Sequence, residues 1–119
     1  MINTKIHGIL DYMMGVLLII SPWIFNLPEG AATILPIVLG AGTILYSLLT
    51  VYELGAYGLI PMPVHLTIDI LAGVLLIAAP WIFGFSDRVY LPFVILGAIE
   101  VLAGLMTAKK PLTPELEKR

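Results

Sequence analysis

The chain has 119 residues, of which 60% are hydrophobic and 12% are charged, and its formal net charge is -2. Soluble domains are about 45 to 50% apolar and about 25% charged, so this composition indicates a one-domain integral membrane protein. Six basic residues are too few for a surface that binds nucleic acid. The chain contains no cysteine, which excludes disulfides, thiolate metal sites and a thiol nucleophile.

Four apolar stretches are long enough to cross a hydrocarbon core of about 30 Å, which needs roughly 17 to 25 helical residues. They lack the alternating pattern and the turns about every ten residues that barrel strands show. We therefore predict an all-α membrane protein with four transmembrane helices. These cover residues 6–25, 31–52, 64–83 and 89–106.

The first and third stretches are near-copies. Residues 7–25 and 65–83 align without a gap and are identical at eleven of nineteen positions. The second and fourth match at a shift of 57, which pairs Gly40 with Gly97 and Thr50 with Thr107. Each repeat is thus predicted to be a helical hairpin, and both hairpins enter the membrane from the same side. The predicted organisation is repeat 1 (5–53), a cytoplasmic linker (54–63), repeat 2 (64–108) and a polar cytoplasmic tail (109–119).

Each copied helix ends on a proline-tryptophan pair, within SPWIF at 21–25 and APWIF at 79–83. Proline lacks the N–H that its helix needs, and Asn26 and Gly84 directly afterwards favour the left-handed conformation that closes a helix. Tryptophan at this position suits the membrane–water interface. We interpret the motif as a helix stop and an interfacial anchor. Its residues are Ser21, Pro22 and Trp23 in the first copy and Ala79, Pro80 and Trp81 in the second.

The pattern HGILD…GVLLIISPWIF, then TVYELG, then IPMPVHLTID…APWIF, resembles the SPW-repeat family of small prokaryotic integral membrane proteins. The resemblance covers residues 5–108. It implies two hairpins in a membrane and brings no established activity and no catalytic residues. The second copy departs from the family motif by having Ala79 in place of serine.

Basic residues are concentrated on one side of the predicted topology. The side with both termini holds five of them, whereas the two short loops on the other side hold only Arg88. The positive-inside rule therefore predicts cytoplasmic termini in a multi-pass protein of the cytoplasmic (inner) membrane. The five are Lys5, Lys109, Lys110, Lys118 and Arg119.

Ionisable residues within the apolar stretches are the candidates for function. A charge in hydrocarbon costs at least about 2.5 to 3.5 kcal/mol on insertion scales, so such groups face a partner, a cavity or the bundle interior. The spacing of four between His7 and Asp11 recurs between His65 and Asp69. Because all these groups enter from the cytoplasmic half, we expect them to converge. The expected group is His7, Asp11, His65, Asp69, Glu100 and, at its rim, Glu53.

Small residues predict which helix faces pack closely in the membrane. Gly15 and Gly73 share a face with the His/Asp pairs, so we expect them to form contacts between the two repeats. The other predicted packing positions are Gly40, Thr43 and Ser47 on the second helix, and Gly97 and Gly104, on the face of Glu100, on the fourth.

The sequence leaves three interpretations of the ionisable group open. In the first, local His–Asp pairs fix helix register and packing. In the second, the group is a proton or cation relay, because histidine titrates near neutrality and carboxylates take up protons. In the third, two histidines and two or three carboxylates bind a divalent metal. We favour the first, a non-enzymatic structural, assembly or stress-related membrane component.

No catalytic residues are expected, because the chain has neither a nucleophile–base set nor a Gly-rich phosphate loop. No cofactor is expected either, since His7 and His65 lie too near the membrane surface for a bis-histidine haem. The expected partners are lipid and further copies of the chain in a homo-oligomer. The sequence defines no small-molecule ligand.

Overall fold

The computed structural model describes residues 1–110, which are helical apart from turns and loops. Within this range β pairing is limited to two isolated bridges, so the predicted all-α fold is confirmed. The predicted tail lies outside the described residues from residue 111 onward. The four helices are α1 (Thr4–Ile24), α2 (Ala31–Leu48), α3 (Met62–Ile82) and α4 (Leu91–Met106).

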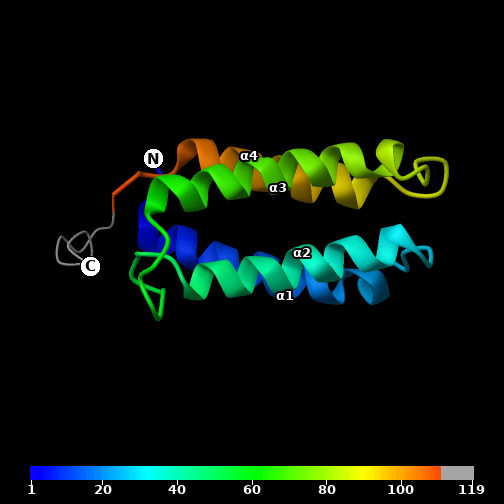
Figure 1. The fold of residues 1–119 in the computed structure, drawn as a ribbon. Helices are drawn as coiled ribbons and strands as arrows, with labels where there is room; N and C mark the ends of the chain where they lie inside the picture. The colour runs from blue at the N-terminus through cyan, green and yellow to red at the C-terminus, as the bar shows by residue number, and fades with distance from the viewer. Residues whose placement is uncertain (111–119) are drawn as a thin grey trace.

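Two helical hairpins lie side by side, α1 packed with α2 and α3 packed with α4 (Figure 1). α1 and α3 begin at the same end of the molecule and run in the same direction, so the repeats are parallel, as predicted. The segment that joins α2 to α3 returns to this end, which also holds the N-terminus. We call it the terminal end, and we call the opposite end, where α1 and α3 finish, the Pro-Trp end.

Three helices are long and apolar enough to cross a membrane, α1 and α3 with 21 residues each and α2 with 18. α4 is also apolar but has 16 residues, starting at Leu91 rather than at the predicted residue 89. At 1.5 Å per residue its length is about 24 Å, less than the hydrocarbon core of about 30 Å. The structure thus has three full-length candidate spans and a shorter fourth.

α1 and α3 both begin two residues earlier than predicted. The side chain of Asn3 caps α1 by accepting a hydrogen bond from the Ile6 amide at 2.8 Å, which satisfies a free N–H of the first turn. Pro63 lies in the first turn of α3, where a missing N–H costs nothing. As a result, His7 and His65 are each the fourth residue of their helix.

α2 ends at Leu48, four residues before the predicted end. Two amides of the following loop donate to the Leu48 carbonyl, at 2.7 and 3.0 Å, and so take the place of further helical hydrogen bonds. An isolated bridge between Thr50 and Ile60 then closes the loop. This fold-back turns Tyr52 inward, where its side chain is 1% exposed.

Both copied helices end with the same backbone motif. Asn26 follows α1 with a φ of 51°, and the amide of Leu27 donates to the Pro22 carbonyl at 2.9 Å. Gly84 takes the equivalent position after α3 with a φ of 75°. A left-handed residue followed by this backward hydrogen bond is a Schellman ending. The predicted helix stops are therefore confirmed.

Ser21 has a defined partner in the first of these endings. Its hydroxyl donates to the Leu18 carbonyl at 2.7 Å. That carbonyl would ordinarily accept the N–H of residue 22, but Pro22 has no N–H to donate. The serine therefore satisfies a buried acceptor that the proline leaves free. Ala79 has no hydroxyl, so the second ending forms without this bond.

Trp23 and Trp81 lie one residue further along, and their side chains are 72% and 57% exposed. An exposed indole at the end of an apolar helix keeps its ring in the apolar zone and its N–H in the wet zone. Their role as interfacial anchors stays a prediction.

Glycines bring together the two helices within each hairpin. A Cβ at Gly40 would lie 2.5 Å from the Gly15 carbonyl oxygen, and a Cβ at Gly97 would lie 2.6 Å from that of Gly73. The expectation that Gly15 and Gly73 form contacts between the repeats is therefore wrong. Each packs against the antiparallel partner that the short loop of its own hairpin holds beside it. Of the other predicted packing positions, Thr43, Ser47 and Gly104 are also buried.

Replacing Gly40 by alanine tests this close approach. Because the new Cβ would meet backbone, α1 and α2 must move apart, and we expect a loss of about 1 to 3 kcal/mol in the free energy of unfolding. Unfolding in detergent, followed by circular dichroism, measures the change. Gly42→Ala is the matched control, because a Cβ there has no atom within 4 Å. Equal stability of the two variants would contradict the proposed helix contact.

Candidate functional site

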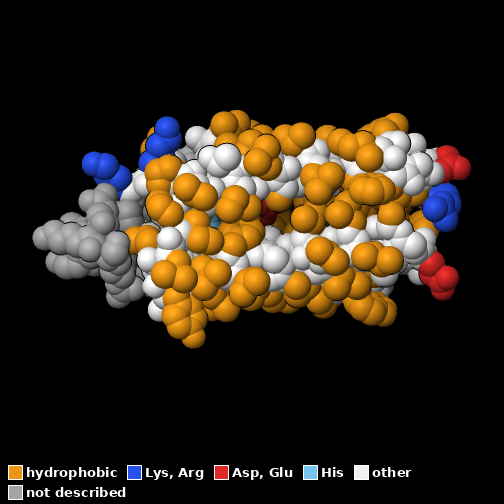
Figure 2. Space-filling model, in the orientation of Figure 1, with side chains coloured by type: hydrophobic (Ala, Val, Ile, Leu, Met, Phe, Trp, Pro, Cys, Tyr) orange, Lys and Arg blue, Asp and Glu red, His pale blue; other side chains and the backbone are white. Residues whose placement is uncertain are grey.

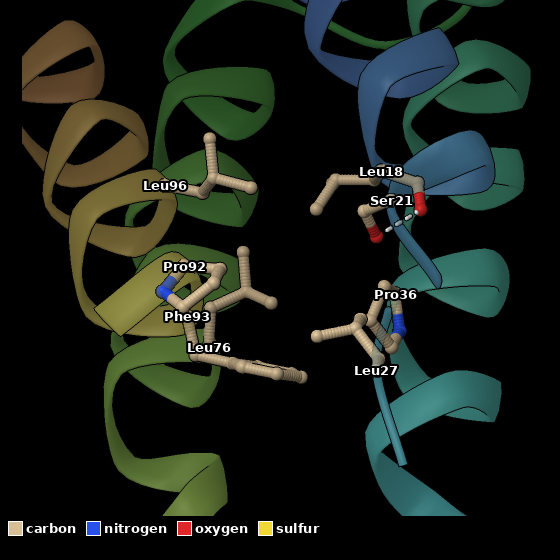
Figure 3. Close-up of a pocket in the computed structure, with 8 residues that line it drawn as sticks. All are labelled: Leu18, Ser21, Leu27, Pro36, Leu76, Pro92, Phe93 and Leu96. Carbon is tan, nitrogen blue, oxygen red and sulfur yellow. Dashed lines mark hydrogen bonds between the residues drawn. The ribbon is translucent and has the colours of Figure 1, made fainter. Parts of the chain in front are cut away.

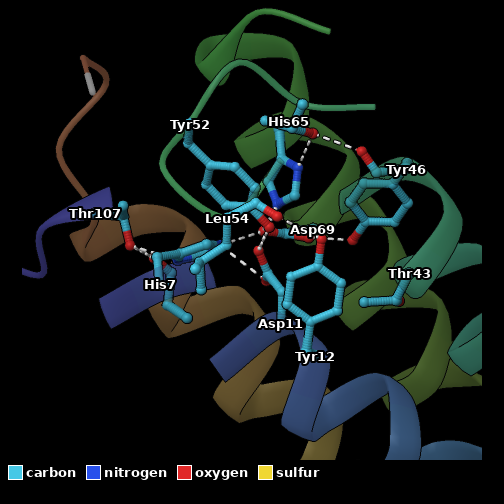
Figure 4. A network of polar contacts seen from close by, with 12 residues as sticks. His7, Asp11, Tyr12, Thr43, Tyr46, Tyr52, Leu54, His65, Asp69 and Thr107 are labelled. Carbon is cyan, nitrogen blue, oxygen red and sulfur yellow. Dashed lines mark hydrogen bonds and ion pairs between the residues drawn. The ribbon is translucent and has the colours of Figure 1, made fainter. Parts of the chain in front are cut away.

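Four ionisable side chains converge between the hairpins near the terminal end (Figure 4). His7 and Asp11 come from the first two turns of α1, and His65 and Asp69 come from the same turns of α3. All four are at most 3% exposed. We call these four residues the polar cluster.

The closest pairs of the polar cluster cross from one repeat to the other. His7 Nε2 lies 2.7 Å from Asp69 Oδ2, and His65 Nε2 lies 2.9 Å from Asp11 Oδ2. The predicted local pairs are present but longer, at 3.1 Å for His7–Asp11 and 3.2 Å for His65–Asp69. Each histidine therefore contacts both carboxylates, and each carboxylate contacts both histidines.

Two threonine hydroxyls fix the outer ring nitrogens of the histidines. The Thr107 hydroxyl donates to the Ala103 carbonyl at 2.5 Å, and since it has one hydrogen, it must accept from Nδ1–H of His7 at 2.7 Å. Thr50 does the same for His65, at 2.6 Å. Both histidines thus carry a proton on Nδ1, and both direct Nε2 at the carboxylates.

Two tyrosines hold the carboxylates from the other side. The Tyr46 hydroxyl donates to Asp69 Oδ1, and the Tyr52 hydroxyl donates to Asp11 Oδ2 at 2.9 Å. Tyr52 belongs to the loop after α2, and burial, together with the Asp11 carboxylate, raises the pKa of its phenol well above the usual value. Tyr52 therefore remains a hydrogen-bond donor.

Sequence reasoning did not identify these four supporting residues. For Thr50 and Thr107 a signal was available, because the two are equivalent in the repeat alignment. For Tyr46 and Tyr52 the sequence offered no such signal. Tyr46 aligns with Ala103, and Tyr52 reaches the site only because α2 ends early and the chain folds back.

The other two expected members lie beside the polar cluster. Glu53 accepts a hydrogen bond from the Thr4 hydroxyl at 2.7 Å. Glu100 is 6% exposed and, together with Asp11, lines a cavity of about 320 Å³ between α1 and α4. The remaining lining residues are apolar: Leu10, Met13, Met14, Leu17, Ile99 and Ala103.

The charges of the polar cluster can cancel without any outside partner. Two doubly protonated imidazoles balance two carboxylates, and moving a proton from Nε2 to a carboxylate leaves the sum at zero. A neutral, fully hydrogen-bonded set is the arrangement in which buried ionisable groups cost least. The cluster can therefore join the repeats, exchange protons internally or bind a cation in place of protons.

The Pro-Trp half of the bundle is apolar. Leucine, proline and phenylalanine side chains of the two hairpins face each other there across a cavity of about 10 Å³, with the Ser21 hydroxyl turned to its own backbone (Figure 3). A space of this size holds about one water molecule. The buried core on this side consists of Met14, Leu18, Leu27, Ala32, Leu76, Ala79, Phe85, Phe93 and Leu96.

The molecular surface has the pattern of a membrane protein. Hydrophobic side chains cover the flank in view, and charged side chains gather at the two ends (Figure 2). Acidic atoms are visible at the bottom of a hollow between the hairpins.

The tandem hairpins, the paired Pro-Trp endings and the duplicated His–Asp spacing agree with one family. In a comparison with known protein families, the SPW repeat domain matches residues 5–107. The chain belongs to the SPW repeat family. Searches of the curated proteins and of the solved structures each gave no match. In this SPW repeat protein, both copies place the His–Asp pair at the start and the Pro-Trp pair at the end of the first helix.

Proposed function

We propose that the protein is a non-enzymatic structural component of the membrane, in which the polar cluster joins two hairpins into one bundle. The observation that carries this proposal is the crossing of the His–Asp pairs, His7 with Asp69 and His65 with Asp11. In the described part of the chain, α2 and α3 make far fewer close contacts with each other than the two helices within each hairpin make. A buried contact that ties α1 to α3 therefore has a large share in keeping the repeats together.

A backbone contact beside the polar cluster supports the same role. The Ile2 amide donates to the Met106 carbonyl, and the Ala108 amide donates to the Ile2 carbonyl, both at 2.9 Å. The chain before α1 is thus paired with the chain after α4. Thr107, which accepts from His7, lies within this paired segment.

We further propose that all four helices cross a cytoplasmic membrane with both termini inside. Lys5, Lys109 and Lys110 are at the terminal end, whereas the loops at the Pro-Trp end have Arg88 as their one basic residue, beside Glu29 and Asp87. This asymmetry supports the orientation through the positive-inside rule. Tilting or local thinning of the bilayer would accommodate the short α4.

Lipid and further copies of the chain are the proposed partners. Large apolar side chains are exposed on every helix, which suits contact with lipid or with an identical neighbour. The scarcity of basic side chains supports the exclusion of nucleic acid.

Asp69→Asn tests the joining role. The substitution keeps the size of the side chain but removes the charge that faces both histidines. Breaking a buried ion pair by removing one partner costs about 3 to 5 kcal/mol, and we expect a loss of this size in the free energy of unfolding in detergent. Asp87→Asn is the control, because Asp87 is exposed in the α3–α4 loop. An Asp69→Asn protein as stable as the control would refute the joining role.

Proton or cation movement is the second candidate function. Its specific support is the cavity lined by Asp11 and Glu100, which brings a third carboxylate, that of Glu100, next to the polar cluster. The apolar Pro-Trp half opposes it, because a path there would have to open by movement or form between subunits.

Liposomes that contain the purified protein and a pH-sensitive dye decide between the two candidates. We expect no proton flux above that of protein-free liposomes, because the apolar half interrupts any polar path. Flux in the parent protein that is lost in both Asp11→Asn and Glu100→Gln would overturn this expectation and establish the relay.

A further inference from the structure

The inward nitrogen of His65 is not satisfied by the polar groups around it. His65 is fully buried, and in the described part of the chain its Nε2 has no hydrogen-bond partner. Asp11 Oδ2 and Asp69 Oδ2 lie 2.9 and 3.2 Å away, but off the direction in which a ring N–H donates. A buried polar atom of this kind requires an explanation, and a bound ion is one.

The spacing of the inward atoms fits one small ion. The four contacts between Nε2 and carboxylate oxygens range from 2.7 to 3.2 Å, and one ligand atom from each residue lies within 4.8 Å of all the others. Tetrahedral zinc has metal–ligand distances of about 2.0 to 2.2 Å, which place neighbouring ligand atoms about 3.3 Å apart. The four His–Asp contacts would therefore need to lengthen by only a few tenths of an ångström.

Each residue of the polar cluster is also held by a partner outside the cluster. Thr107 and Thr50 accept the Nδ1–H of the two histidines, and Tyr52 and Tyr46 donate to the two carboxylates. Metal-binding histidines and carboxylates are oriented by outer partners in this way. Since Tyr46 occupies Asp69 Oδ1, Asp69 can offer Oδ2 as a single ligand atom.

Charge and donor type select the ion. Two carboxylates cancel a divalent charge, so the loaded site with two neutral imidazoles is as neutral as the same site holding two protons. Imidazole nitrogen suits zinc and the late first-row metals, whereas calcium takes six to eight oxygens and magnesium requires an oxygen octahedron. We propose that His7, Asp11, His65 and Asp69 bind one divalent transition-metal ion of the zinc class, with Nε2 of each histidine and one oxygen of each aspartate as ligands.

This inference rests on the joining role, because the ion would replace the protons in the same contacts between the repeats. Binding would release two protons per ion, so affinity rises with pH. Among the described residues, the other titratable groups near the site are Tyr12 from α1, Tyr46 from α2, Tyr52 from the loop and Glu100 from α4.

Cobalt is the probe for the test, because four-coordinate Co²⁺ absorbs visible light strongly. The full chain is purified in detergent without a polyhistidine tag, stripped with a chelator and titrated with Co²⁺, and circular dichroism checks that it stays folded. We expect one equivalent to bind with the spectrum of a four-coordinate ion and to be displaced by Zn²⁺. A folded protein that binds no stoichiometric Co²⁺ would overturn the proposal.

Thr50→Val tests whether Co²⁺ binds at the oriented His–Asp site or binds nonspecifically elsewhere on the protein. It leaves all four ligands in place and removes the hydroxyl that accepts the His65 Nδ1–H and donates to the Tyr46 carbonyl, so we expect Co²⁺ affinity to fall about 10- to 100-fold. Thr107→Val, which acts on His7, should give a similar loss. Thr67→Val is the control, because the exposed Thr67 hydroxyl makes the same kind of bond to a carbonyl four residues back without reaching a histidine. Equal affinities in Thr50→Val, Thr107→Val and Thr67→Val would also overturn the proposal.

The same preparations distinguish failure of this inference from failure of the joining role. If the metal site is wrong but the joining role is right, metal-free parent protein binds no Co²⁺, yet Asp69→Asn is still less stable than the parent. If the joining role is wrong, Asp69→Asn and the parent have equal stability in the metal-free state.

Discussion

The central constraint on this fold is that two histidines and two aspartates must be neutralised inside an apolar bundle. Isolated charges at this depth would cost several kilocalories per mole, so each must find an opposite partner. The duplicated sequence puts the four residues at the same height on two parallel helices. Crossed contacts place each of the four beside an opposite partner, and in doing so they hold the repeats together.

The surroundings of the polar cluster depart from the two-fold symmetry of the repeat. The threonines that orient the histidines are equivalent, but Tyr46 aligns with Ala103, and Thr43 aligns with Glu100. One flank is therefore closed by a tyrosine, whereas the flank between α1 and α4 has a cavity lined by Glu100. The symmetric residues form the contacts between the repeats, and the asymmetric ones give the polar cluster one closed flank and one flank with a cavity.

The sequence was sufficient to predict the architecture and the convergence of the four central residues, because both follow from the duplication. His7 and Asp11 recur as residues 65 and 69 on helices that must run in parallel. The duplication therefore places all four residues at the same height in the bundle. The helix ends could also be predicted from the sequence, since Asn26 and Gly84 directly follow the two PWIF segments.

Other features depend on contacts that no local pattern encodes. The early end of α2 results from loop amides that donate to the Leu48 carbonyl, and it alone brings Tyr52 to Asp11. The partners of Gly15 and Gly73 were assigned to the wrong interface, because a small residue indicates a close approach but not which helix approaches. The crossed His–Asp contacts are shorter than the local ones. This difference likewise depends on the rotation of α1 and α3 about their axes.

A double-mutant cycle between His7 and Asp69 tests the central claim most directly. The free energies of unfolding of His7→Gln, Asp69→Asn and the double variant are compared with that of the parent in detergent. The crossed contact predicts a coupling energy within about 0.5 to 3 kcal/mol, because the second substitution removes a partner that the first has already left alone. Additive effects, as expected for His7→Gln combined with Asp87→Asn, would contradict the crossed pairing.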